Sequence, residues 1–194
     1  MFEPWTVANR QGLPFRVFTP FWKHLLSLGL PSQVLPEPDL AGRLTGSGRF
    51  DGSSIDALGL LPSLNWANGI AAAWRPDRAS AQARLDEFAA SKLAQYDSGR
   101  DRPGQDGVSR LSPYLHFGQL GPREVVAALG AHNGLGMPYL RELGWREFAH
   151  YQLYHFPHTT DAPLDRRFER FPWRDSAEDL VAWQRGQTGI PMVD

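Results

Sequence analysis

Four residues in the last third of the chain have the types and spacing to form one chemical surface. Glu142 precedes Arg146 by four residues, the order that favours an ion pair on a helix, and His150 follows after four more. Trp145 stands three residues after Glu142, so a helix would place all four side chains on one face. Together they can accept from a nucleobase edge, stack on the base and bind a phosphate. An ion pair beside a core Trp explains the same spacing, and both interpretations stay open.

A second candidate site is the segment Gly107-Val108-Ser109-Arg110-Leu111-Ser112, ahead of a short predicted helix. Hydroxyls and free backbone N–H groups there suit an anion such as a pyrophosphate, and Arg110 can neutralise it. The serines can equally act only as helix caps. Arg100 and Arg102 extend the region into a phosphate patch or into a solvated run of charge.

Several classes of chemistry are excluded. The chain has no Cys, so it has no disulfide, thiolate metal site or Cys nucleophile. Its six His residues show no convincing metal-ligand spacing, and we expect no metal. The sequence contains no phosphate-binding P-loop, no Gly-rich dinucleotide fingerprint and no Ser-His-Asp signature.

Length and charge set further bounds. A chain of 194 residues fits one domain or a domain with part of another. With 20 basic and 21 acidic residues, any polyanion site must be a local patch. The sequence has no membrane-length apolar run and no signal-peptide pattern at its start. We therefore expect a cytoplasmic protein with no membrane partner.

Helices must position these residues. Residues 15–18 suggest a short strand, and 21–28 a helix that ends at Gly29. Residues 30–74 are rich in Pro and Gly and predict a linker. An amphipathic helix is expected over 78–96, shorter helices over 111–117 and 122–129, and a buried helix over 138–156. A last helix begins at a Ser176–Asp179 capping box and stops at Gly186.

Five segments resemble the photolyase and cryptochrome family. They are GVSRLSPYLHFGQLGPR (107–123), YLRELGWREFAHYQLYHFP (139–157), FERFPW (168–173), AWQRGQTGIPMVD (182–194) and VFTPFWK (17–23). They occur in the family's order across nearly the whole chain, and together they are highly specific. The resemblance implies a mainly α fold: the first part of a helical FAD-binding domain at 76–194, after the C-terminal remnant of an α/β antenna domain at 1–30 and an interdomain linker at 31–75.

The resemblance also implies the cofactor and its contacts. FAD would be reached by the residues that match the family's flavin-binding positions, namely Tyr96, Val108, Ser109, Arg110, Leu111, Ser112 and Tyr139. The family's usual Thr is Val108 here, which removes one hydroxyl and implies weaker binding. A second antenna chromophore, of unknown identity, is implied for the full-length protein.

The partner implied by the resemblance is UV-damaged DNA, bound by a monomer. Lesion contact falls on Glu142 and Trp145, with Arg146 beside them and Arg100 on the DNA backbone. The implied reaction is that of a deoxyribodipyrimidine photolyase: an electron from light-excited reduced FAD splits a flipped-out cyclobutane pyrimidine dimer. Trp173 matches the outermost Trp of the chain that reduces the flavin.

Other functions remain open. The ELGWREF form resembles dimer-repairing photolyases more than animal cryptochromes, but a blue-light photoreceptor without repair activity has the same flavin motifs. A non-catalytic nucleic-acid-binding or structural piece is a third class. The family's domain continues beyond the position of Asp194 with residues that grip the flavin ring and with the inner electron-transfer Trp residues. We therefore expect this chain alone to bind flavin poorly and to be inactive.

Overall fold

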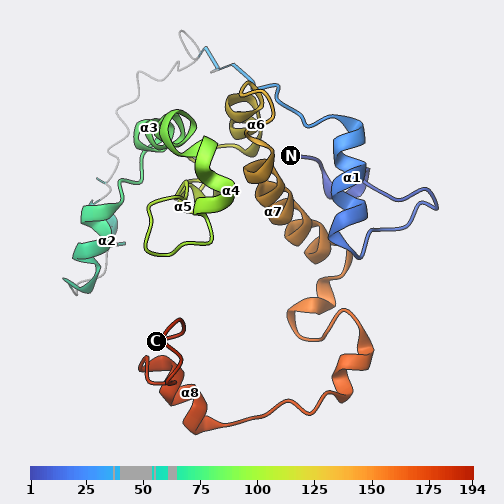
Figure 1. Cartoon of the computed structure of the whole chain (residues 1–194), viewed down its shortest axis with the longest axis vertical. Helices are drawn as coiled ribbons and strands as arrows, with labels where there is room; N and C mark the ends of the chain where they lie inside the picture. The colour runs from blue at the N-terminus through green and yellow to red at the C-terminus, as the bar shows by residue number, and fades with distance from the viewer. Residues whose placement is uncertain (37, 40–53, 55, 61–64) are drawn as a thin grey trace. The chain divides into compact units, whose positions relative to one another are not determined.

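The computed structural model describes residues 1–36, 38–39, 54, 56–60 and 65–194, and every regular element within them is a helix. The α-helices in these ranges are α1 (Phe18–Leu28), α2 (Asn68–Ala73), α3 (Arg78–Glu87), α4 (Tyr96–Gly99), α5 (Ser112–His116), α6 (Pro122–Gly130), α7 (Met137–His155) and α8 (Ala177–Gln184), as Figure 1 shows. The predicted mainly α class is confirmed. The chain forms two compact units, Met1–Tyr151 and Gln152–Asp194.

The strand predicted over 15–18 is wrong, because α1 already begins at Phe18. Phe18, Phe21, Trp22 and Leu25 follow each other at three- and four-residue spacing, and all are buried on one side of the helix. Pro20 lies in the first turn, where a missing N–H leaves no helical hydrogen bond unmade. Gly29 ends the helix as predicted, with φ 80°.

The predicted linker falls only in part within the described residues. Its positions 37, 40–53, 55 and 61–64 lie outside the described residues. Its described part is not wholly irregular, since it contains the short helices η2 (Asp56–Leu58), η3 (Asn65–Ala67) and α2. Trp74 follows α2 and packs on Tyr114 of α5, with the ring centroids 5.9 Å apart.

The helix predicted over 78–96 is present but irregular. Asp77 caps α3 by accepting from the Ser80 N–H at 2.7 Å. After α3 the helix changes type. A π-helical segment, η4 (Phe88–Lys92), is followed by a 3₁₀ segment, η5 (Leu93–Gln95), and then by α4. The change of pitch keeps Phe88, Leu93 and Tyr96 all buried.

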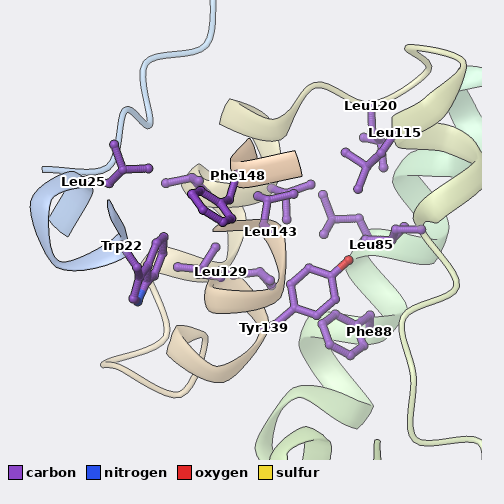
Figure 2. Packing of buried hydrophobic residues seen from close by; sticks show 14 of the residues in the cluster. Trp22, Leu25, Leu85, Phe88, Leu115, Leu120, Leu129, Tyr139, Leu143 and Phe148 are labelled. Atoms are coloured by element: carbon purple, nitrogen blue, oxygen red, sulfur yellow. The ribbon is translucent and has the colours of Figure 1, made fainter. Parts of the chain in front are cut away.

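Helix α7 runs through the core of the first unit. In Figure 2, Trp22 of α1 packs on one side of α7, and Leu85 and Phe88 pack on the other. Gly144 permits the α1 crossing, because a Cβ there would lie 2.6 Å from the Trp22 ring. The predicted burial on nearly all sides is wrong in part, since the exposed large side chains of this helix include Trp145, Leu153 and Tyr154.

The second unit contains the end of α7, η6 (Pro157–Thr160), η7 (Arg166–Arg170) and α8. The predicted start of α8 is confirmed, because Ser176 Oγ accepts from the Asp179 N–H at 3.2 Å. Gly186 follows the helix with φ 61°. The apolar residues of α8, Leu180, Val181 and Trp183, are exposed in this chain. Among the described helices, none combines the length and apolarity needed to span a bilayer.

Candidate flavin and nucleic-acid site

A cavity of about 1130 Å³ opens in the first unit between the segment before α5, α5 itself and α7. The sequence-predicted residues that line it are Val108, Ser109, Arg110, Leu111, Ser112, Tyr139, Glu142 and Arg146, together with His150. The fold therefore brings the loop and the α7 face, predicted separately, to one place. The volume suits an organic cofactor or a flipped nucleotide.

The loop before α5 is fixed by a pair of hydroxyls. Ser109 is buried, and its Oγ donates to the Tyr139 hydroxyl on α7 at 2.9 Å while accepting from the Leu111 N–H at 3.3 Å. Burial raises the pKa of Tyr139, and the Ser109 hydrogen bond opposes that shift. The N-cap of α5 is Leu111, with no side-chain cap. The alternative in which the serines only cap the helix is therefore wrong.

Arg110 stands in the left-handed region of the backbone, with φ 54°. Non-glycine residues adopt this conformation at a cost, so the surrounding structure must hold it in place. Its guanidinium lies 3.3 Å from Asp106, whose other oxygen holds Lys92 at 2.8 Å. The Lys92 hydrogen bond lowers the pKa of Asp106, so this carboxylate stays charged and anchors the loop to η4.

Glu142 is paired with Arg100 and not with Arg146. The Arg100 guanidinium donates to Glu142 Oε1, and this hydrogen bond raises the pKa of Arg100. Arg146 instead binds Glu147 at 3.1 Å and the Leu115 carbonyl at 3.5 Å. The ion pair expected from the four-residue spacing is thus wrong. Glu147, next to Arg146, binds that guanidinium, and Arg100, which follows α4, binds the Glu142 carboxylate.

Tyr96 lies behind the cavity wall, outside the residues that line it. Its ring packs edge-on against Tyr139, with centroids 5.2 Å apart, and the Arg100 guanidinium lies 5.7 Å above it. Burial raises the pKa of Tyr96 to about 12. Its hydroxyl therefore stays protonated at neutral pH, and its ring supports both Tyr139 and Arg100.

Trp145 is the member of the α7 group that does not line the cavity. Its indole stacks on the Phe18 ring, with centroids 3.6 Å apart and planes 12° apart, and the residue is 45% exposed. It is therefore not the core Trp of the alternative interpretation. A stacked but accessible indole suits contact with another ring.

In the second unit, Trp173 is exposed. Its Nε1–H donates to the Phe168 carbonyl at 3.3 Å, and its ring centroid lies 4.6 Å from that of Phe171. These local contacts fix the indole within its own unit. Among the described residues, no group of three or more acidic, His or Cys side chains could hold a metal ion.

Comparison with known proteins decides the family. Residues 139–194 match the family model of the FAD binding domain of DNA photolyase. Deoxyribodipyrimidine photo-lyases of Agrobacterium fabrum and Synechococcus are 34% and 33% identical over 99% of this chain, and cryptochrome-2 of Arabidopsis thaliana is 30% identical over 100%. The chain belongs to the photolyase and cryptochrome family. It spans 41%, 42% and 34% of the lengths of these relatives.

A solved structure agrees with this family membership. The structure of a bacterial class III photolyase from Agrobacterium tumefaciens superposes on this chain with a TM-score of 0.79 at 29% identity. The superposition covers 99% of this chain and 41% of the photolyase chain. The match therefore includes α1 as well as the helices that carry the cavity.

Sequence reasoning missed part of the cavity wall of this photolyase-family chain. Trp74, His116 and Phe117 also line it. Trp74 comes from the region predicted as linker. An isolated Trp in a Pro- and Gly-rich segment has no helical or strand periodicity that could assign it to a site. Phe117 directly follows α5 and is exposed, which the sequence alone could not show for an aromatic residue.

Proposed function

We propose that this chain carries part of the flavin and DNA site of a deoxyribodipyrimidine photolyase. The observation that supports this most is the joining of two surfaces in one cavity. One surface is the hydroxyl-bearing loop 108–112, and the other is the α7 wall with Glu142 and Arg146. The first suits a dinucleotide cofactor and the second suits a nucleobase with its phosphate.

The residues present fit FAD. The cavity walls are mainly apolar, with polar groups concentrated in the loop, as is usual for cofactor sites. Ser112 and the remaining loop N–H groups would hold the pyrophosphate, with Arg110 as its counter-charge. Ser109 would keep Tyr139 in place beside the cofactor, with Tyr96 behind it. The chemistry that reduced, light-excited FAD would supply here is one electron for the dimer, which would return to the flavin once the dimer bond has broken.

The proposed DNA contacts use charged side chains at the cavity wall and beside it. The net charge of −1 gives no general attraction to DNA, so Arg100 and Arg146 supply the local positive charge. On binding, a phosphate takes Arg100 from Glu142, and the released carboxylate accepts a hydrogen bond from the flipped base. Flipping costs a few kcal/mol, least for a damaged and poorly stacked base, which favours the cyclobutane dimer.

Two further roles complete the proposal. Trp145 would stack on the flipped dimer, and Trp173, which is exposed, would be the surface residue that receives electrons from an external reductant for the flavin. A blue-light receptor of the cryptochrome type is the second candidate, because a plant cryptochrome matches the whole chain at 30% identity. It would use the same cofactor residues without lesion recognition.

A binding experiment separates the two. Trp145→Ala should weaken binding to an oligonucleotide with a single thymine cyclobutane dimer by roughly tenfold more than binding to its undamaged counterpart, since base–aromatic stacking supplies about 1–3 kcal/mol. Fluorescence anisotropy measures both affinities. Tyr154→Ala removes another exposed ring of α7 and serves as the matched control. Equal losses on both oligonucleotides would favour the receptor and reject the lesion site.

A further inference from the structure

The environment of Trp145 contains a residue to which the family motifs assign no role. Phe18, on α1, covers one face of the indole with its ring, and the two planes are 12° apart. Phe18 is only 3% exposed, whereas Trp145 is 45% exposed. The stack thus has a buried inner ring and an accessible outer ring.

The inner ring is held on several sides. Phe148 meets Phe18 edge-on at 5.8 Å, and Trp22 lies nearly parallel to it at 6.2 Å. The close approach of α1 to α7 that makes this possible depends on Gly144, where any side chain would meet the Trp22 ring. Phe18 is therefore a fixed support, and the position of the indole follows from it.

We propose that Phe18 is a positioning residue that holds the Trp145 indole with one face covered and the other open to an unstacked pyrimidine. This inference rests on the proposed function and explains how the Trp145 indole is positioned for stacking on the base. An indole that is already stacked loses less rotamer freedom when a base arrives. Because one face is blocked, the base can stack only from the side of the open face.

A purely structural role for the pair fits the exposure less well. A Trp that served only to fill the core would be buried, and nearly half of Trp145 is accessible. Its neighbours on α7, Glu142 and Arg146, both line the cavity. The Arg141 guanidinium lies 5.9 Å from the Phe18 ring and adds positive charge beside the stack, which suits a nucleic acid.

The test compares two equivalent substitutions on one helix. Phe18→Leu keeps apolar volume but removes the ring under Trp145. Phe21→Leu makes the same change at a buried ring whose partners are Phe15, Phe148 and Tyr151. Phe18→Tyr keeps the ring. Each variant is measured for its affinity ratio between dimer-containing and undamaged oligonucleotides and for the NMR position of the Trp145 indole N–H, assigned with Trp145→Phe.

We expect Phe18→Leu to lower the affinity ratio about two- to tenfold, the range of one aromatic pair, and to shift the Trp145 resonance. Phe21→Leu and Phe18→Tyr should leave the ratio near that of the unaltered chain. If Trp145→Ala lowers the ratio and Phe18→Leu behaves like Phe21→Leu, the inference is overturned and the proposed function stands. If the unaltered chain has no preference for the dimer, the proposed function fails, and an unchanged Trp145 resonance in Phe18→Leu then overturns the positioning role separately.

Discussion

Replacing Glu142 by Gln should weaken binding to dimer-containing DNA and strengthen binding to undamaged DNA. In the unaltered chain Glu142 Oε1 holds the Arg100 guanidinium, and the two side chains are 32% and 31% exposed. A pair with this much solvent contributes less than about 1 kcal/mol to folding, so the variant should remain folded. Its effect should therefore appear in ligand binding.

The magnitudes follow from the two partners. The neutral amide that replaces the carboxylate no longer forms an ion pair with Arg100. The guanidinium then has only the exposed Asp101 at 3.5 Å, so it can bind one more phosphate of undamaged duplex DNA and steepen the slope of log K against log salt by about 0.9. The factor by which this contact increases the affinity therefore falls about threefold between about 50 and about 200 mM salt. The hydrogen bond to the dimer loses its charge, and charge-assisted bonds are about twice as strong as neutral ones, so about 1 kcal/mol, or about fivefold, is lost.

The assay is a salt titration of affinity with dimer-containing and undamaged duplexes, by fluorescence anisotropy. We expect the variant to bind undamaged DNA more tightly at low salt and with a steeper slope, and to bind the dimer less tightly. Arg100→Gln is the control. Because it removes the phosphate contact itself, it should make the salt dependence for the dimer-containing duplex shallower, and it should not tighten binding to undamaged DNA. Equal weakening on both duplexes, with an unchanged slope, would refute the exchange of Arg100 between Glu142 and a phosphate.

Three further outcomes are expected. Val108→Thr, which adds a hydroxyl at the cavity wall, should raise affinity for FAD about two- to tenfold, measured by flavin fluorescence; no change would mean that this wall does not contact the cofactor. Gly144→Ala should destabilise the first unit by about 1–2 kcal/mol in urea, since its Cβ would meet Trp22 at 2.6 Å and the overpacking exceeds the gain in helix propensity; a more stable variant would show that α1 can shift freely. Glu124 has a pKa lowered by the bound Arg78 guanidinium, so its carboxylate stabilises the fold above its unfolded pKa and loses that effect as pH falls through its folded pKa. Glu124→Gln should therefore be less stable than the unaltered chain at neutral pH, and the difference should shrink below about pH 4.5; a difference independent of pH would contradict this.

The helices were predictable where apolar residues recur at helical spacing or where flanking residues mark a helix end. The 3.6-residue pattern and the flanking Gly and Pro residues located α6, α7 and α8 to within about two residues. The same reasoning failed at α1, because the short apolar run 15–18 fits a strand as well as a helix. Only the packing of Phe18 against α7 selects the helix.

The site was predictable as residues but not as contacts. Spacing placed Glu142 and Arg146 on one helix face, and the structure brings both to the cavity. Spacing could not show that Glu142 pairs with Arg100, which is 42 residues away in the chain. Nor could it show the Phe18–Trp145 stack, because both depend on how helices distant in sequence pack together.

The central claim is that the α7 face with Glu142 at the cavity wall and Trp145 beside it recognises a damaged base. The most direct test is competition between an oligonucleotide with one thymine cyclobutane dimer and the same undamaged sequence for binding to the unaltered chain. One polar contact and one stacked ring predict a preference for the dimer of about tenfold or more. A ratio near one would contradict the claim.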